Sequence, residues 1–268
     1  MIHRVAVTIV AVILCIIIYK LPRVVVDNDS LETNVSEETV TPDHNFEISE
    51  EDSIRIRNYF DAIYANGINE KSTIFADSLA NLYLAYNQLD SAEKYGRLIL
   101  SQGDGLENYR LAGEIFFKAF GFSQVQEEAK KFSELAGNCF NVLLKANPDD
   151  PDTRAKLAMT LVSSASPMQG INLLRDVLKD YPDNQTALYS LGVLSMQSGQ
   201  YDKAVNRFEK LIELNPQNVQ ALFYLGVSQF ELGNSKEAAE IFRQVKEIDN
   251  DPAIILATDR YLEDINEF

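Results

Sequence analysis

Few side chains in this chain are of the types that perform catalysis or bind metals. The two histidines, His3 and His44, both lie near the N-terminus, so the rest of the chain offers no imidazole to a catalytic triad, a zinc site or a haem. The two cysteines, Cys15 and Cys139, form no Cys-x-x-Cys pair, and there is no glycine-rich phosphate loop. We expect Cys139 to be a buried, inert thiol, because no base stands beside it. The sequence therefore predicts no catalytic residue, no metal, no cofactor and no enzyme activity.

The charge composition argues against a further class of function. The 268 residues include 40 Asp and Glu against 24 Lys and Arg, which gives a net charge of -16. Non-specific nucleic-acid binding needs clustered cations that displace counterions from phosphate, so we expect no nucleic-acid partner. The carboxylates are spread along the chain, and we interpret them as solvated surface rather than as a site for a small-molecule substrate. An enzyme or carbohydrate-binding module that uses surface carboxylates is the weaker alternative.

The N-terminus has the composition of a membrane segment. Residues 5–19 are almost entirely apolar, and Lys20 and Arg23 follow them. Fifteen helical residues span roughly 22 Å, so crossing a hydrocarbon core of about 30 Å requires the flanking residues as well. The residues after the run offer no small side chains for a signal peptidase. We expect an uncleaved signal-anchor helix over residues 1–23; the alternatives are a cleaved signal peptide, a buried helix and a lipoprotein anchored at Cys15.

An acidic tether is expected over residues 24–53. This stretch contains ten carboxylates and no Lys or Arg, and its apolar residues follow no helical or strand period. Such a segment cannot bury enough surface to offset its ordering entropy, so we expect a flexible linker; an acidic docking motif is the alternative.

The resemblance of the N-terminus to an export signal favours a C-terminal domain outside the cytoplasm, in a bacterium the periplasm. Counting Lys and Arg alone slightly favours the opposite orientation.

The remainder of the chain repeats with a period of 34 residues. Six classes of position share this spacing: Pro148, Pro182 and Pro216; Leu157, Leu191 and Leu225; Ala158, Gly192 and Gly226; Gly199 and Gly233; Ala204 and Ala238; Phe208 and Phe242. Apolar residues at helical spacing before and after Gly199 predict two antiparallel helices in each unit. Gly192 and Ala204 fit where these helices cross most closely. One such hairpin exposes too much apolar surface to be stable alone, so we expect the hairpins to stack.

These units resemble the tetratricopeptide repeat family. The residues that carry the resemblance are Leu188, Leu191, Gly192, Ala204, Phe208 and Pro216 in unit 185–218; Leu222, Leu225, Gly226, Ala238 and Phe242 in unit 219–252; and Leu157, Ala158, Leu161, Leu174 and Pro182 in unit 151–184. Unit 151–184 departs from the pattern at Gly170, where Ala is usual. The resemblance implies an all-α solenoid of helix hairpins that mediates protein–protein interaction.

Two earlier units are degenerate. Unit 73–105 has Gly96 where an aromatic residue is expected. In unit 106–150 the spacing from Gly113 to Ala136 is 23 residues, against 12 from Gly192 to Ala204, which indicates an insertion of 11 residues. Eleven residues are close to three helical turns, so the insertion can lengthen both helices around a turn at residues 120–123. The insertion makes either a taller hairpin or a protruding ledge that binds a partner. A leading helix over residues 54–63 and a capping helix over 253–268 complete a solenoid over residues 54–268.

The resemblance also implies a binding groove. In this family the first helix of each repeat lines an inner, concave wall. The apolar residues at the matching positions are Met159, Tyr189, Val193, Met196, Phe223, Tyr224, Val227 and Phe230. A groove with Met and aromatic residues suits the apolar face of a helix or an extended peptide. The alternative is that Phe223 and Phe230 simply pack against neighbouring helices or the cap.

Together these features predict a membrane-anchored scaffold that binds a protein or peptide segment. By analogy of architecture, we expect a part in the assembly or maturation of envelope proteins. A receptor or adaptor that faces the cytosol, of the kind used in mitochondrial import, is the alternative.

Overall fold

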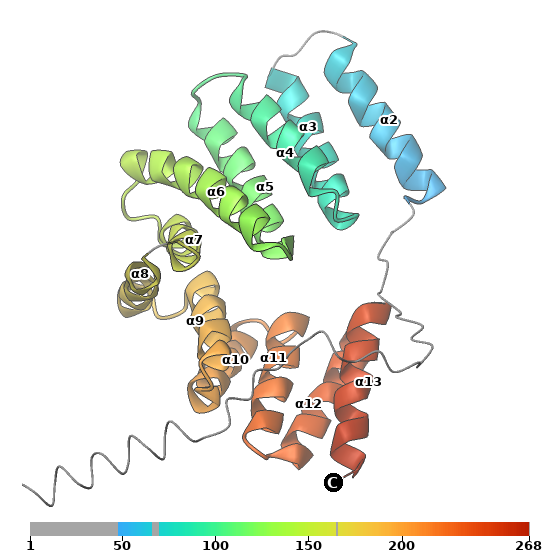
Figure 1. Ribbon diagram of the computed structural model, residues 1–268, viewed down its shortest axis with the longest axis vertical. Helices are drawn as coiled ribbons and strands as arrows, with labels where there is room; N and C mark the ends of the chain where they lie inside the picture. Colours follow the sequence, from blue (N-terminus) through green and yellow to red (C-terminus); the bar gives the residue numbers. More distant parts are fainter. Residues whose placement is uncertain (1–47, 66–69, 165, 268) are drawn as a thin grey trace, which may run out of the picture. The chain divides into compact units, whose positions relative to one another are not determined.

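A computed structural model describes residues 48–65, 70–164 and 166–267, and helices are the only regular elements within these ranges. They are α2 (Glu50–Tyr64), α3 (Glu70–Ala85), α4 (Leu89–Leu100), α5 (Leu106–Phe122), α6 (Gln126–Ala146), α7 (Pro151–Val162), α8 (Pro167–Asp180), α9 (Gln185–Gln197), α10 (Tyr201–Leu214), α11 (Val219–Glu231), α12 (Ser235–Ile248) and α13 (Pro252–Glu267) (Figure 1). The predicted all-α fold is confirmed for this part of the chain. The expected anchor over residues 1–23 and the tether up to residue 47 lie outside the described residues.

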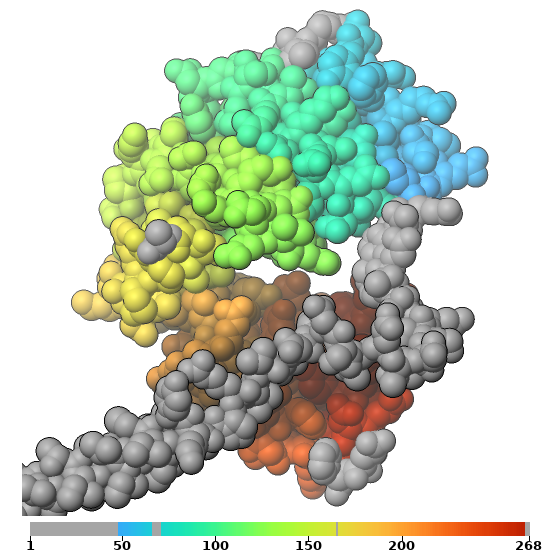
Figure 2. Space-filling model, in the orientation of Figure 1, coloured from blue at the N-terminus to red at the C-terminus, as the bar shows by residue number. Residues whose placement is uncertain are grey.

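The helices pair as five consecutive hairpins between a leading helix and a closing one. Each helix from α2 to α13 packs against the next in the sequence, and the first helices of neighbouring hairpins also touch, α3 on α5, α7 on α9 and α9 on α11. Figure 2 shows successive hairpins as adjoining blocks of colour. The short turns inside the last two hairpins each use a glycine with positive φ, 69° at Gly199 and 81° at Gly233. Other residues reach this left-handed region only at a cost, which is why these two glycines repeat.

The leading helix begins earlier than the sequence indicated. α2 starts at Glu50, so residues 50–53 of the expected tether form its first turn. The Ser49 hydroxyl caps this turn by accepting a hydrogen bond from the Asp52 amide at 3.1 Å. Three carboxylates lie in the turn, where the positive end of the helix dipole favours them. The Tyr86 hydroxyl, at the end of α3, donates to Asp52 Oδ2 at 2.6 Å and ties α2 to the first hairpin.

Glycine lets the two helices of a hairpin approach each other. A Cβ at Gly192 would lie 2.7 Å from the Phe208 ring, and one at Gly226 would lie 2.8 Å from the Phe242 ring. Both phenylalanines are fully buried. The expected close crossing at Gly192 is therefore present, and the partner that demands it is the aromatic ring of the second helix.

Two glycines that depart from the repeat pattern lie where another part of the chain approaches closely. At Gly96, where an aromatic residue was expected, the Phe116 ring of the next hairpin fills the space and lies 2.6 Å from where a Cβ would be. At Gly170 a Cβ would lie 2.3 Å from the Ala158 carbonyl oxygen, because α8 crosses directly over the backbone of α7. Glycine replaces alanine in that unit because the two backbones touch.

The insertion lies in the helices rather than in the turn. α5 has 17 residues and α6 has 21, against 13 in α9 and 14 in α10. The turn falls at residues 123–125, slightly later than the expected 120–123. Phe120 lies within α5, and its half-buried ring contacts the Phe117 ring, with ring centroids 6.1 Å apart.

No helix of the described ranges has the length and apolar character needed to cross a membrane.

Candidate protein-binding groove

The eight predicted groove residues lie on the first helices of three neighbouring hairpins. Met159 is on α7; Tyr189, Val193 and Met196 are on α9; Phe223, Tyr224, Val227 and Phe230 are on α11. All are half-buried except Val227, which is buried with 7% of its surface exposed. Val227 therefore belongs to the core, and the other seven keep part of their surface open to solvent.

Four of these residues belong to a continuous chain of aromatic contacts. Tyr189 lies 6.0 Å from Tyr224 between ring centroids, and Tyr224 stacks on the buried Phe208 at 5.7 Å. The chain continues through Phe223, whose ring centroid lies 5.8 Å from that of Tyr224 and 5.8 Å from that of Phe242. Since each ring holds its neighbours, the open faces of these residues are fixed in position before any partner arrives.

The closing helix α13 completes this chain through one residue. Tyr261 contacts Phe223 at 5.9 Å, Phe230 at 5.5 Å and Phe242 at 5.0 Å. Phe223 and Phe230 therefore pack against the cap, as the alternative interpretation expected. For Phe230 this packing accounts for the ring contacts that the structure gives it. Phe223 also faces a pocket.

An apolar pocket of about 270 Å³ opens between α11 and α13. It is lined by Val219, Gln220, Phe223, Tyr224, Ala253, Ile254 and Ala257. The sequence prediction included only Phe223 and Tyr224. The missed signal is that the 34-residue period runs on: Ala253 and Ala257 follow Val219 and Phe223 by one period. α13 thus takes the place that the first helix of a further hairpin would occupy, and the pocket is the junction between two such helices.

The groove is uncharged in its C-terminal part. Burial raises the pKa of Tyr189, and the neighbouring Tyr224 raises it further, so the Tyr189 phenol is neutral at physiological pH. α9 carries no charged side chain, and the one charged side chain of α11 is Glu231 at its last residue. Two lysines on earlier first helices are paired. The Lys156 ammonium donates to the Glu114 carboxylate, and Lys118 donates to Asn81 Oδ1 at 2.7 Å. Lys156, the one lysine at a groove position, is therefore engaged already.

Outside the groove, the described residues offer no reactive thiol and no metal site. Cys139 is buried with 2% exposed, and burial raises the pKa of its thiol to about 11. Within the ranges that the structure covers, no three His, Cys, Asp or Glu side chains gather closely enough to hold a metal ion.

Comparison with known proteins identifies the repeats. A tetratricopeptide repeat family model matches residues 155–204 and 194–253. The thermophilic TPR protein TTC0263 of Thermus thermophilus is 15% identical, with a TM-score of 0.51 over 65% of this chain and 89% of its own. YrrB, described as a TPR protein with an unusual peptide-binding site, is 20% identical, with a TM-score of 0.42 over 76% and 99%. MamA of MSR-1 is 25% identical, with a TM-score of 0.45 over 60% and 87%. Comparison with curated proteins gave no match.

The Thermus structure shares the helical fold, and the two matched segments cover the last three hairpins. These findings support tetratricopeptide repeats in this chain, over residues 155–253.

Proposed function

We propose that the chain is a protein–protein interaction scaffold that holds an apolar segment of a partner against α9, α11 and α13. The observation that carries this proposal is the apolar pocket between α11 and α13, which adjoins the half-exposed rings of Phe223 and Tyr224. An apolar side chain of a partner can enter the pocket while its neighbours lie along Tyr189, Val193 and Met196. Because the aromatic chain fixes these surfaces in advance, binding orders few side chains of the scaffold.

The partner segment is a helix face or an extended peptide that presents apolar residues. Tyr224 and Gln220 line the pocket, and a phenol and a carboxamide can pair with polar groups of the segment. Unpaired carboxylates or ammonium groups are absent from the pocket lining, so a highly charged segment gains nothing there.

Site-specific photocrosslinking tests the groove. A benzoylphenylalanine at Gln220, which is exposed and lines the pocket, should give a discrete adduct with one partner in membranes. The matched control is Gln217, exposed in the preceding turn and outside the pocket. Equal labelling from both positions, or no adduct from Gln220, would contradict the proposal.

A second variant blocks the pocket without removing a core side chain. Ala253 is exposed at the start of α13, where a carboxylate suits the helix dipole, so Ala253→Glu should leave the fold intact while it charges the pocket. The Gln220 adduct should then disappear. Gln126→Glu, at the exposed first residue of α6, adds the same charge at a helix N-terminus away from the groove and should leave the adduct unchanged.

We further propose that residues 1–23 anchor the scaffold as a single-pass membrane protein with its C-terminal domain outside the cytoplasm. The apolar run and the acidic tether support this arrangement, and assembly or maturation of envelope proteins is the role we infer for it. A reporter fused to the C-terminus and active only in the cytosol should stay inactive. An active reporter would favour a receptor that faces the cytosol.

A further inference from the structure

An arginine lies where the neighbouring hairpins have an apolar residue. Arg207 of α10 follows Leu173 of α8 by one 34-residue period and precedes Ile241 of α12 by one period. Leu173 and Ile241 both pack in apolar clusters of the core. The Arg207 side chain is half-buried at the equivalent position. Because arginine keeps its proton in proteins, α10 carries a positive charge where α8 and α12 carry a hydrocarbon side chain.

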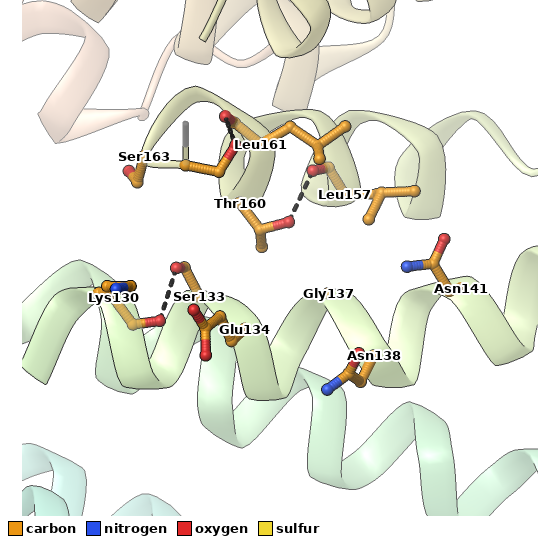
Figure 3. Close-up of a pocket in the computed structure, with 11 residues that line it drawn as sticks. Lys130, Ser133, Glu134, Gly137, Asn138, Asn141, Leu157, Thr160, Leu161 and Ser163 are labelled. Atoms are coloured by element: carbon orange, nitrogen blue, oxygen red, sulfur yellow. Dashed lines mark hydrogen bonds between the residues drawn. The ribbon is translucent and has the colours of Figure 1, made fainter. Parts of the chain in front are cut away.

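The residue of α9 that contacts Arg207 is polar as well. Ser195 is buried, with 7% of its surface exposed, and its Oγ accepts a hydrogen bond from Arg207 Nη1 at 2.7 Å. One period earlier the equivalent residue is Leu161, which packs against the apolar core. Figure 3 shows Leu161 on α7, where it lines a pocket of about 520 Å³ between α6 and α7. The polar pair of Ser195 and Arg207 therefore occupies the positions of two leucines in the preceding hairpin.

A second arginine lies beside the first. The second helices of consecutive hairpins run in the same direction, and Leu178 of α8 packs against the cluster that contains Phe208 of α10. Arg175 precedes Leu178 by three residues and so shares its face of α8, while Arg207 directly precedes Phe208. Burial lowers the pKa of Arg207, and the nearby positive charge of Arg175 lowers it further. Two guanidinium groups of like charge are thus neighbours at the junction of α8 and α10.

Neither guanidinium group is neutralised by a carboxylate. Among the residues that the structure describes, none forms an ion pair with Arg175 or Arg207. Their other hydrogen bonds go to neutral acceptors: Arg207 donates to the Lys203 carbonyl oxygen at 3.1 Å, and Arg175 donates to Asn172 Oδ1 at 3.4 Å. The exposed Asp202 raises the pKa of Arg207, but by less than Arg175 lowers it. A half-buried charge beside a like charge is unfavourable unless a counter-charge is present.

The two arginines together suit an oxyanion of the phosphate type. A guanidinium group is a planar fork that donates parallel hydrogen bonds to two oxygens of one anion. The Nε and Nη2 atoms of Arg207 have no acceptor within the described ranges, so they are available to a ligand. Two positive charges balance a phosphate dianion, whereas a single carboxylate would leave one of them unbalanced. Since the chain has a net charge of -16, its overall field repels anions, and any attraction must be local.

We infer that Arg175 and Arg207 form a binding site for a phosphate-type oxyanion between α8 and α10. The anion accepts hydrogen bonds from both guanidinium groups and removes the repulsion between them, while Ser195 holds Arg207 in position. Because the two arginines belong to consecutive hairpins, the bound anion joins one hairpin to the next. Free phosphate and phosphate monoesters both supply this group. The site shares no residue with the groove on α9, α11 and α13, so either proposal can fail without the other.

Titration calorimetry with inorganic phosphate tests the site. The full-length protein in mild detergent is titrated at constant ionic strength, set with sodium chloride, at a mildly alkaline pH where phosphate is chiefly a dianion. Phosphate should bind saturably, and the monoanion dimethyl phosphate should bind about tenfold more weakly, because it leaves one charge unbalanced. Absence of saturable binding, or equal binding of dimethyl phosphate, would overturn the inference.

Glycerol 3-phosphate distinguishes the two sources of the anion. If it binds as tightly as inorganic phosphate or more tightly, the site accepts a phosphate ester. If it is excluded while phosphate binds, the ligand is the free ion. Either result supports the site.

Two variants localise the binding. Arg207→Leu introduces the residue type of Leu173, and Arg175→Gln removes the second charge. Each should weaken phosphate binding by about tenfold or more, as expected for the loss of charge-assisted hydrogen bonds. The matched control is Arg243→Gln, because Arg243 is exposed and follows Arg175 by two periods, but its repeat has Ile241 in place of Arg207. This control should bind phosphate as the wild type does.

The exposed arginine keeps the test decisive. If Arg207→Leu fails to fold, Arg175→Gln decides, because Arg175 is exposed and its replacement removes no core side chain. Undiminished phosphate binding by Arg175→Gln, or an equal loss in Arg243→Gln, would also overturn the inference.

Discussion

The contact between Gly192 and Phe208 makes a quantitative prediction about what holds each hairpin together. In Gly192→Ala the new methyl group would lie 2.7 Å from both Cε1 and Cζ of Phe208. The Phe208 ring is fully buried and is held by Tyr189 at 6.4 Å and Tyr224 at 5.7 Å, so it cannot swing away freely. The two helices must therefore separate, or the aromatic chain must shift.

Two opposing terms set the size of the effect. Overpacking a well-packed core costs about 1–3 kcal/mol. Alanine is more favourable than glycine inside a helix by about 1 kcal/mol, which offsets part of that cost. Gly192→Ala should thus destabilise the protein by up to about 2 kcal/mol. The same substitution at Gly121, where a Cβ meets no heavy atom within 4 Å, should stabilise it by up to about 1 kcal/mol.

Urea unfolding of the full-length chain in mild detergent measures both variants. Far-ultraviolet circular dichroism is the appropriate signal, because the chain has no Trp. The midpoint should fall for Gly192→Ala by up to about 1 M and rise for Gly121→Ala. If the urea midpoint rises for both variants, the Phe208 ring does not require a glycine at position 192, and the claim is refuted.

Two further predictions concern titratable groups that are partly or fully buried. Burial raises the pKa of the Asp77 carboxyl, so the charged carboxylate destabilises the folded protein, and this destabilisation grows as the pH rises through that pKa. The Asp77→Asn variant should therefore have a higher melting temperature than the wild type at pH 7. The difference in melting temperature should vanish below about pH 4, where the carboxyl is protonated. An equal difference at both pH values in thermal melts would show that charge burial is not the cause. In a Cys15→Ser background, Cys139 should react with a disulfide reagent at pH 8 only at the rate of unfolding, because the thiol is buried and its pKa is raised to about 11. Complete reaction of the native protein on mixing would contradict this placement.

The aromatic residues of the groove have two structural tasks. Phe223 contacts Phe242 and the Tyr261 ring of α13, and it also lines the apolar pocket. Truncating Phe223 would therefore disturb the cap as well as the groove, so loss of binding in such a variant could not be assigned to the groove alone. Ala253 and Gln220 are better positions for perturbation, because they line the pocket from exposed sites and hold nothing else in place.

Contacts inside one hairpin could be predicted from the sequence because they recur at fixed separations. Gly192 and Phe208 are 16 residues apart, as are Gly226 and Phe242, and the turn glycines Gly199 and Gly233 fall between them. A helix–turn–helix unit closes locally, so its spacing is set by helix periodicity and by the size of the side chains at the crossing. The same regularity placed Tyr189 and Phe223 on the first helices of their hairpins.

Contacts between hairpins were decided by the tertiary structure. Phe116 fills the space beside Gly96 from the next hairpin, and Tyr261 of α13 packs against Phe223 and Phe230. In both cases the side chain that makes the contact comes from outside the hairpin it packs against, and the repeat pattern does not specify it. The packing density of the interior requires that a space be filled, but it does not specify which neighbouring helix fills it. The sequence thus determined the repeating unit by itself, while the pockets and their linings arose only when the units were stacked.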